Sequence, residues 1–549
     1  MYSNMSEIGG NRDELTCIRP KHVNQVPGSP ETLDLIRGWA QTCWTEHQPC
    51  VYERRRRLSK AKLSNTMPKR LLSVGQTGMS HVTLQDDPPF LHSTTDTRYA
   101  ALSYCWGDGN FCTMIENINE IRQGISLDLL PNTIRDAIRL TRVLLLPYIW
   151  IDALCIIQDD QLDKRYELPK MASIYGAADV VFSASRAHSC REGFLYPRNL
   201  SETFQTLYIF PLYDRPNGDA AGKVIVSERA LADRDGDEPI DKRGWTLQEQ
   251  VQALSLLKCG SRQWRWTCYV EKDGLIDGGD LYFNITTRFD STNFDGRPSP
   301  AIFGPNAPSQ DPVTLRDLWD HWRRYVTMYS ARELSVRNDA LPALGTMAEN
   351  FATRMRGMAG RYWAGLWEYD LPGELLWFKP KASSKNAARV GPSWSWAHSA
   401  GPVHFPYIFF LSKSDSKVEI LGCTVESNAS GWSYGSVTRA VLTLKGHLQP
   451  LFWKGEYLCY MGRGGGSDTI TLLTFWDFEN GRELLDLFLL EIFQEKEAQG
   501  IILHRLENGV FERVGYYTSS GCPVDNSSLG KASVSQAGME TAPHEFILV

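Results

Sequence analysis

Two short apolar segments that end in polar residues constrain the fold of this chain most. Residues Tyr99–Gly107 read YAALSYCWG, an apolar stretch that runs into a polar, aromatic turn ending in glycine. Residues Tyr148–Asp152, YIWID, end in the same way. In open α/β sheets, polar groups at the carboxyl ends of neighbouring parallel strands gather at one edge and build ligand sites. We therefore expect such a sheet here, with a ligand site at that edge.

The segments around these two strands alternate between strand and helix patterns. A strand at 99–104 precedes a helix near 132–146, and a strand at 148–152 precedes a helix near 165–177 and a third strand at 179–184. This order predicts right-handed crossovers and an α/β domain with an open parallel sheet. Short strand signals dominate from about residue 360, which predicts a mixed α+β, strand-rich C-terminal region. We expect four segments: a helical and irregular N-terminal part, the α/β domain, a linker with a helical segment, and the strand-rich domain, at 1–95, 96–275, 276–355 and 356–549.

The strand tips supply the first candidate binding residues. Ser103 and Asp152 end the first two strands, and Trp106 and Gly107 lie just beyond the first tip. Such an edge can hold phosphate or ribose hydroxyls, and an indole can stack on a base. The alternative is that Ser103 and Asp152 only cap a loop and the next helix.

Polar residues also follow the second strand. Gln158 and Asp159 either fix their loop or contribute to the same edge. Cys155 lies among apolar residues, which favours a packed thiol over a nucleophile.

Residues Arg243–Glu249, RGWTLQE, combine a cation, a glycine, an indole and a carboxylate. We assign Arg243 and Trp245 to binding and Glu249 to catalysis. Thr246 and Glu249 also have the spacing of a capping box, which would explain these two residues without a site.

Cys43, His47 and Cys50 have spacings compatible with metal binding. Structural zinc needs four ligands, and no second C-x-x-C is adjacent. Plain helix packing therefore competes with zinc, and we assign no metal site. Arg54–Arg57 is a basic cluster that is either a solvated helix face or a nuclear import signal.

Composition narrows the function classes. The net charge of −6 over 549 residues gives no argument for a nucleic-acid or membrane partner. No apolar run reaches roughly 18 residues, and the N-terminus lacks a secretory pattern. The twelve scattered cysteines are expected to be reduced, so a cytoplasmic location is expected, with the nucleus left open by the basic cluster. The phosphate-loop and nucleophile-elbow motifs, G-x-x-x-x-G-K-[ST] and G-x-S-x-G, are absent.

Three blocks of this sequence resemble the heterokaryon incompatibility (HET) domain family of filamentous fungi. They are Tyr99–Gly107, Tyr148–Asp159 and Arg243–Glu249. Leu130–Ala137 and Met171–Ala178 also fit between them, and the resemblance covers about residues 99–268. The chain departs from the family at Leu254–Cys259, where the family usually has an arginine after the serine.

The resemblance implies a role in fungal non-self recognition, promoting vegetative (heterokaryon) incompatibility and programmed cell death through protein partners or self-association. HET domains have been compared with Toll/interleukin-1 receptor (TIR) domains, which are flavodoxin-like, and some TIR domains cleave NAD. TIR-type hydrolases use a glutamate after the third strand, often in a C-x-x-E setting. Here Cys190-Arg-Glu192 has C-x-E spacing. Glu192 and Glu249 are thus the candidate catalytic residues and NAD the candidate substrate, while a cofactor is unknown. An accessory or biosynthetic role in a secondary-metabolite pathway is a further alternative.

Overall fold

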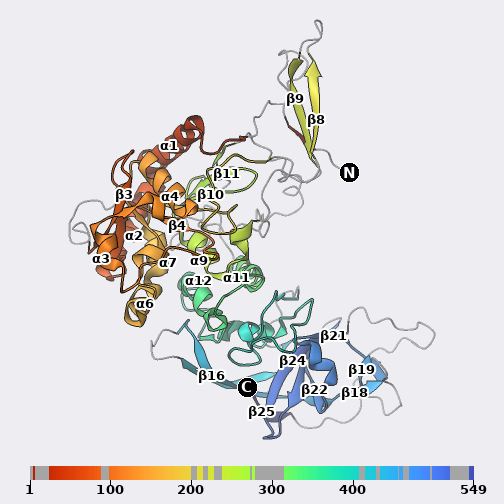
Figure 1. Ribbon diagram of the computed structural model, residues 1–549. Coiled ribbons are helices and arrows are strands. Elements are labelled where there is room, and N and C mark those ends of the chain that lie inside the picture. The colour runs from red at the N-terminus through yellow and green to blue at the C-terminus, as the bar shows by residue number, and fades with distance from the viewer. Residues whose placement is uncertain are drawn as a thin grey trace. The chain divides into compact units, whose positions relative to one another are not determined.

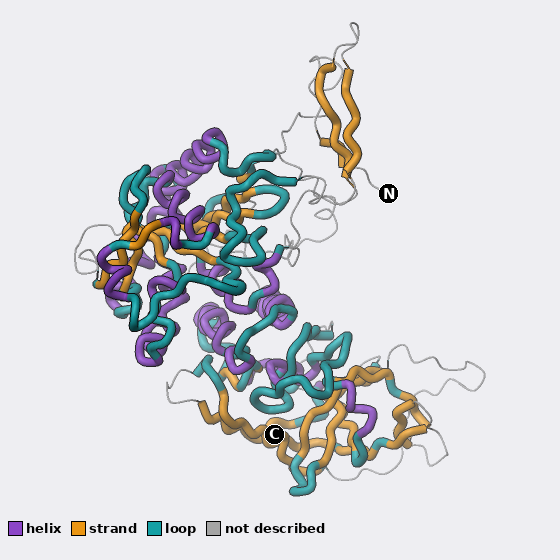
Figure 2. The backbone as a smooth tube through the Cα atoms, in the orientation of Figure 1, coloured by secondary structure: helices purple, strands orange, loops and turns teal. Residues whose placement is uncertain are grey.

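The chain divides into two compact units, Met1–Pro308 and Ser309–Val549. The computed structural model describes residues 4–6, 24–87, 98–199, 207–213, 220–227, 238–271, 275–277, 315–406, 415–427, 433–454, 457–461, 469–494, 497–519 and 543–549. Figure 1 labels the elements, and Figure 2 shows that helices and strands intermix in the first unit, whereas strands dominate the end of the second.

A nine-stranded sheet forms the frame of the first unit, in the order β12-β11-β10-β7-β4-β6-β2-β3-β5. Its four middle strands, β10, β7, β4 and β6, are parallel, and the strands on either side are antiparallel. The bounds are β2 Arg70–Ser73, β3 His81–Asp86, β4 Tyr99–Ser103, β5 Ile125–Ser126, β6 Tyr148–Trp150, β7 Val180–Ser183, β10 Ser255–Cys259, β11 Trp264–Cys268 and β12 Leu275–Ile276. The expected α/β class is confirmed, and the antiparallel flanks are an addition to the parallel sheet predicted from the sequence.

The order of the parallel strands locates the natural ligand edge. Numbered along the chain, β4, β6, β7 and β10 lie in the order 2-1-3-4, as in flavodoxin-like sheets. The connection from β4 leads to β6 on one side, and the later connections lead to β7 and β10 on the other side. The strand order therefore reverses between β4 and β7. Ligands of open α/β sheets bind outside the carboxyl ends of the strands at such a switch point.

Helices cover both faces of this sheet (Figure 1). The crossover from β4 to β6 contains α4, which packs with α1. The later crossovers contain α7 and α9, which pack together, and α7 also packs with α2. The crossover from β4 to β6 and the later crossovers run in opposite directions across the sheet. Because both kinds are right-handed, their helices must lie on opposite faces of the sheet. The bounds are α1 Pro30–Thr45, α2 Gln48–Leu63, α3 Ile118–Gln123, α4 Asn132–Val143, α5 Asp152–Cys155, α6 Gln161–Glu167, α7 Met171–Ala177 and α9 Gly244–Gln252.

The first helix begins where its sequence predicts. The Ser29 hydroxyl accepts a hydrogen bond of 3.3 Å from the Thr32 N–H, and Pro30 occupies the first turn. Ile36, Ala40 and Cys43 form its buried stripe. The next helix, α2, starts at Gln48 and thus includes Pro49 in its own first turn.

The basic cluster lies on α2 and is mostly used inside the unit. Arg57 is buried, bonds Glu53 at 2.8 Å and donates to the Gln252 carbonyl at 2.7 Å. Arg54 pairs with the buried Asp179 at 2.8 Å, whereas Arg55 is exposed. The interpretation as a solvated helix face therefore holds for Arg55 but not for Arg54 and Arg57. Their ion pairs make these two side chains less available to an import receptor.

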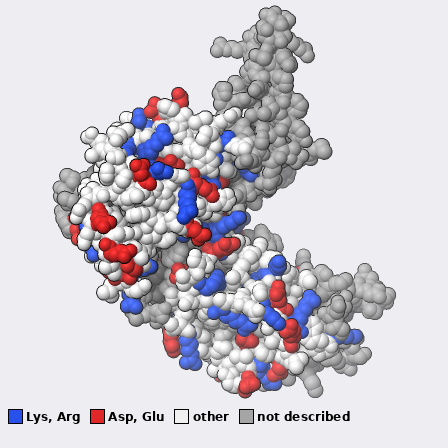
Figure 3. Space-filling model, in the orientation of Figure 1, with Lys and Arg blue, Asp and Glu red and all other residues white. Residues whose placement is uncertain are grey.

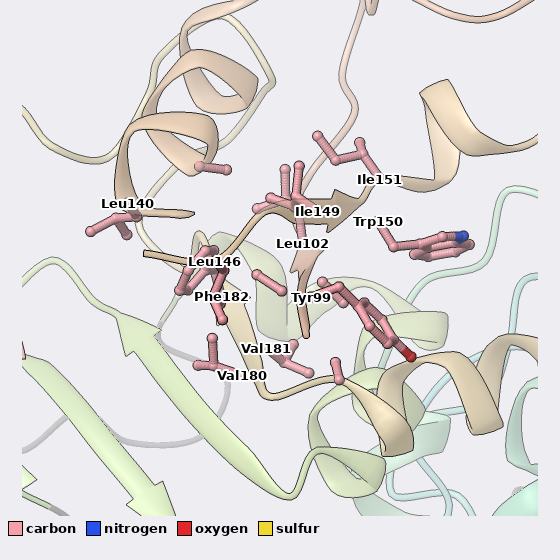
Figure 4. Packing of buried hydrophobic residues seen from close by; sticks show 14 of the residues in the cluster. Tyr99, Leu102, Leu140, Leu146, Ile149, Trp150, Ile151, Val180, Val181 and Phe182 are labelled. Atoms are coloured by element: carbon pink, nitrogen blue, oxygen red, sulfur yellow. The ribbon is translucent and has the colours of Figure 1, made fainter. Parts of the chain in front are cut away.

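The core of the first unit is built from β4, β6 and β7. Figure 4 shows their side chains interleaved, among them Tyr99, Ile149 and Phe182, which are all fully buried. The Tyr99 hydroxyl donates to the Ile174 carbonyl at 2.6 Å, which satisfies its one polar group in the core. This dense core fixes the strand tips that carry the candidate site.

A separate three-stranded sheet, β1-β9-β8, also belongs to the first unit. Its bounds are β1 Asn4–Ser6, β8 Leu207–Tyr213 and β9 Ala220–Ser227. The strand signal expected at 223–226 lies within β9.

The second unit begins with two helices and continues into sheets that are mostly antiparallel. The helices are α11 Leu315–Ser330 and α12 Pro342–Arg354. An eight-stranded sheet has the order β15-β16-β25-β24-β23-β22-β17, with β21 paired to β24, and β18-β19-β20 and β13-β14 form smaller sheets. The bounds are β13 Tyr362–Trp363, β14 Leu366–Trp367, β15 Glu419–Ser427, β16 Val437–Gly446, β17 Leu448–Pro450, β18 Phe452–Lys454, β19 Tyr457–Met461, β20 Thr469–Thr471, β21 Leu473–Trp476, β22 Leu487–Gln494, β23 Ala498–Arg505, β24 Phe511–Thr518 and β25 His544–Leu548. The predicted strand-rich C-terminal region is confirmed.

On the face drawn in Figure 3, cationic and anionic side chains intermix. Within the described ranges, none of the helices is both long and apolar enough to span a bilayer.

Candidate functional site

Helix α9 brings Glu249 to the switch point. It contacts both β4 and β7, the two strands between which the chain reverses. The helix begins at Gly244, and the Thr246 hydroxyl donates to the carbonyls of Ile240 and Arg243, each at 2.8 Å. The capping-box interpretation is therefore wrong, because Thr246 and Glu249 do not cap the helix. Glu249 instead points into the protein and is only 6% exposed.

The surroundings of Glu249 favour its protonated form. Burial, together with the nearby charge of Asp152, raises the pKa of its carboxyl to about 7. Hydroxyls of Ser103 and Tyr175 and the charge of Arg243 oppose this rise. Ser103 is fully buried, and its hydroxyl lies beside the Glu249 carboxyl.

Asp152, the first residue of α5, is the carboxylate of the site that reaches the surface. It is surrounded by protein but keeps partial solvent exposure. The Trp106 indole N–H donates to both carboxylate oxygens at 3.0 and 3.2 Å, and the Ala153 N–H donates at 2.7 Å. Burial raises the pKa of Asp152 to about 6, while Arg243 and these hydrogen bonds oppose the rise. Asp152 is thus mostly ionised at neutral pH, and the Trp106 ring is held by its N–H.

Arg243 connects α9 to the first strand tip. Its guanidinium donates to the carbonyl of Tyr104, the residue after β4. Its charge also acts on Cys105, although burial raises the pKa of that thiol to about 11. Trp245 lies in the first turn of α9 and is partly exposed. One cation therefore acts on both carboxylates of the site.

The turn after β4 depends on its glycine. Gly107 has φ +60°, and a Cβ there would lie 2.5 Å from the Cβ of Ser189. The Trp106 carbonyl accepts from the Cys190 N–H at 3.0 Å. The segment after β7 thus holds the Trp106 turn in place.

Gln158 and Asp159 fix their loop. The Gln158 side chain donates to the carbonyls of Asp152 and Ile156 at 3.0 and 3.1 Å, and Asp159 accepts from the Ile115 N–H at 2.9 Å. Gln158 therefore supports the backbone of Asp152, whereas exposed Asp159 ties the loop to residue 115.

Glu192 is not placed with Glu249. It is exposed and accepts hydrogen bonds from the His188 main-chain N–H at 2.9 Å and from the His188 ring at 3.4 Å. The structure thus brings Ser103, Trp106, Asp152, Arg243 and Glu249 together, and it leaves Glu192 in a surface turn.

The sequence analysis did not select Tyr175 or Cys105 for this site. Tyr175 lies on α7, is 1% exposed, and donates to the Leu102 carbonyl at 3.1 Å beside Glu249. Its position in the Met171–Ala178 block was a usable signal, because that block lies directly before the third strand.

Two adjacent carboxyls with raised pKa values can divide acid and base roles between them. Because they interact, their protons are released as a coupled pair. Asp152 supplies an anion near the surface, Glu249 a buried group that exchanges a proton near neutral pH, and Trp106 a flat apolar ring. This set can accommodate a cationic or electron-poor sugar ring and accept a proton from water.

The metal-type residues lie elsewhere in the unit. Cys43, His47 and Cys50 are joined by Cys268 at the end of β11, with all four ligand atoms within 4.8 Å of one another. The sequence analysis did not include Cys268.

Comparison with known proteins relates the part of the chain that carries these residues to a family. Residues 99–249 match the family model described as heterokaryon incompatibility protein (HET). This part of the chain is a HET domain. Heterokaryon incompatibility protein 6, OR allele, of Neurospora crassa is 35% identical over 92 residues, which are 15% of this chain and 13% of the relative. The chain therefore aligns with only a small part of that relative. Solved structures give no significant match. The resemblance stated from the three sequence blocks is confirmed, and Ser103, Asp152 and Glu249 all lie within the matched residues.

Proposed function

We propose that this protein acts in fungal non-self recognition and that its HET domain brings about heterokaryon incompatibility and cell death. The observation that carries the proposal is that the three HET blocks, far apart in sequence, meet at the switch point of one sheet. Each block supplies a group there: Trp106 from the first, Asp152 from the second, and Arg243 with Glu249 from the third. The three blocks that define the family in sequence would thus also form one functional site. Protein partners or self-association would control it.

Inducible expression of the full chain in a filamentous fungus tests this proposal. We expect growth arrest and loss of viability with the unaltered chain. Asp152→Asn should reduce the toxicity, whereas Glu192→Gln, a carboxylate outside the site, should retain it at equal protein levels. Normal growth with the unaltered chain would contradict the proposal, and equal toxicity of Asp152→Asn would separate the function from the site.

A second candidate function, cleavage of the nicotinamide–ribose bond of NAD, is favoured by the paired carboxyls. The C–N bond would break with its electron pair leaving on neutral nicotinamide, and ionised Asp152 would stabilise the cationic ribosyl group. Water would then add to C1′ and give its proton to the ionised fraction of Glu249. Trp106 would stack on the leaving ring.

Chromatography of NAD incubated with purified full-length protein tests this activity directly. We expect release of nicotinamide, a loss of at least tenfold with Asp152→Asn, and little change with Glu192→Gln. No nicotinamide release at high protein concentration would remove this candidate and leave the incompatibility role untouched.

A further inference from the structure

We propose that Cys43, His47, Cys50 and Cys268 bind a structural zinc ion. The four residues come from the end of α1, the turn after it, the first turn of α2 and the end of β11. Cys268 is 221 residues from His47 in sequence, yet its sulfur lies 3.6 Å from His47 Nδ1. The fold therefore assembles this set from segments that have no local reason to meet.

The donor set fits zinc in number and in kind. Three thiolates and one imidazole form a Cys₃His set, one of the usual tetrahedral combinations of structural zinc sites. Soft sulfur donors select zinc over the hard ions magnesium and calcium. With four protein ligands the site has no open position, which indicates a structural ion rather than a catalytic one.

The geometry fits as well. Bonds of about 2.3 Å to sulfur and about 2.0 Å to nitrogen at a tetrahedral angle place the two donor atoms about 3.5 Å apart. The separation of Cys268 Sγ from His47 Nδ1 is 3.6 Å, and no pair of the four ligand atoms exceeds 4.8 Å.

The surroundings complete the site. The three cysteines are at most 3% exposed, so the ion would be shielded from water. The Glu271 N–H donates to Cys268 Sγ at 3.3 Å, and the Ser255 hydroxyl lies 3.4 Å from Cys43 Sγ. The other ring nitrogen of His47, Nε2, lies 3.9 Å from a carboxylate oxygen of Glu271. Such outer contacts orient metal ligands and support thiolates.

The location gives the ion its role. It would join the turn between α1 and α2 to the antiparallel strand β11, which lies between β10 and β12. Trp44 and Trp266 make an edge-on contact beside it, with ring centroids 6.4 Å apart. Zinc would therefore attach the N-terminal helical pair to the sheet, at a place separate from Asp152 and Glu249.

Elemental analysis of the full-length protein, purified under reducing conditions without chelator, tests the proposal. We expect about one zinc per chain in the unaltered protein and near zero in Cys268→Ser. Cys259→Ser is the matched control, because Cys259 is a fully buried thiol on the neighbouring strand β10 and lies outside the cluster. It should keep its zinc.

Cobalt substitution of the unaltered protein guards against variants that fail to fold. The Co²⁺ form should show the intense visible bands of tetrahedral coordination and a thiolate charge-transfer band. His47→Cys should keep the metal and strengthen the charge-transfer band. Absence of zinc together with absence of these bands would overturn the proposal.

Discussion

Replacing Glu249 by glutamine should stabilise the first unit at alkaline pH. The pKa of Glu249 is about 7 in the folded protein against 4.5 for the free side chain. The folded state therefore holds this proton more tightly than the unfolded state. Stability from this group is fully present below about pH 4.5 and is lost as the pH rises through about 7. Glutamine keeps the shape and carries no charge, so the variant should avoid this loss.

The size of the effect follows from the shift. A difference of about 2.5 units at about 1.4 kcal/mol each gives a cost of about 3 kcal/mol once the group is ionised. We expect Glu249→Gln to exceed the unaltered chain in free energy of unfolding by about 3 kcal/mol near pH 8 and by about 1 kcal/mol or less near pH 5. Small exposure of Glu249 means that solvent screening reduces this figure little.

Hydrogen exchange of peptides that cover β4 and β7, measured against urea concentration and followed by mass spectrometry, reports unfolding of the first unit separately. Glu192→Gln is the control, since it removes a carboxylate that lies in a surface turn. The difference in free energy of unfolding between Glu192→Gln and the unaltered chain should not grow with pH. The reasoning would be refuted if Glu249→Gln were less stable than the unaltered chain at pH 8. It would also be refuted if the substitution changed the free energy of unfolding by the same amount at pH 5 and pH 8.

Three further predictions concern single groups. Gly107→Ala should destabilise the unit by about 1–2 kcal/mol in urea melts because of the positive φ and the contact with residue 189, whereas Gly38→Ala, with open space in mid-helix, should be neutral or stabilise by up to about 1 kcal/mol. Trp106→Phe removes the N–H that donates to Asp152, so carboxyl NMR titration should show the pKa of Asp152 rising further above about 6. Arg70→Met should cost about 3–5 kcal/mol in the same melts, because it leaves the buried carboxylate of residue 163 unpaired.

The sequence could predict the parallel core because its strands are continuous apolar runs that end in polar residues. Tyr99–Ser103 and Val180–Ser183 are buried along their whole length, so both faces must be covered by helices. The antiparallel strand β2 escaped prediction because Arg70 starts it. That arginine can be buried because it pairs with Asp163, 93 residues away, and donates to the Cys155 carbonyl at 2.8 Å, and one segment cannot reveal such partners.

Local sequence segments also could not reveal all the residues of the candidate site. The candidate residues at the strand tips came from local pattern, and pattern could place Ser103 and Asp152 at one edge. The orientation of Glu249 could not be predicted, because capping-box spacing competed with it and the helix starts at Gly244. Cys268 was missed because its three proposed co-ligands are more than two hundred residues away.

The contacts of the segment after β7 argue that Glu192 supports the site rather than acting in it. The Phe194 and Leu195 N–H groups donate to Asp136 on α4 at 2.7 and 3.0 Å, and the Cys190 N–H holds the Trp106 carbonyl. This segment is therefore tied at both ends, to a helix and to the strand tip, and Glu192 closes a turn within it. Its carboxylate accepts hydrogen bonds only from His188 among the described residues. Replacing Glu192 should thus change the activity only as far as the loop moves, whereas replacing Asp152 removes the anion of the site itself.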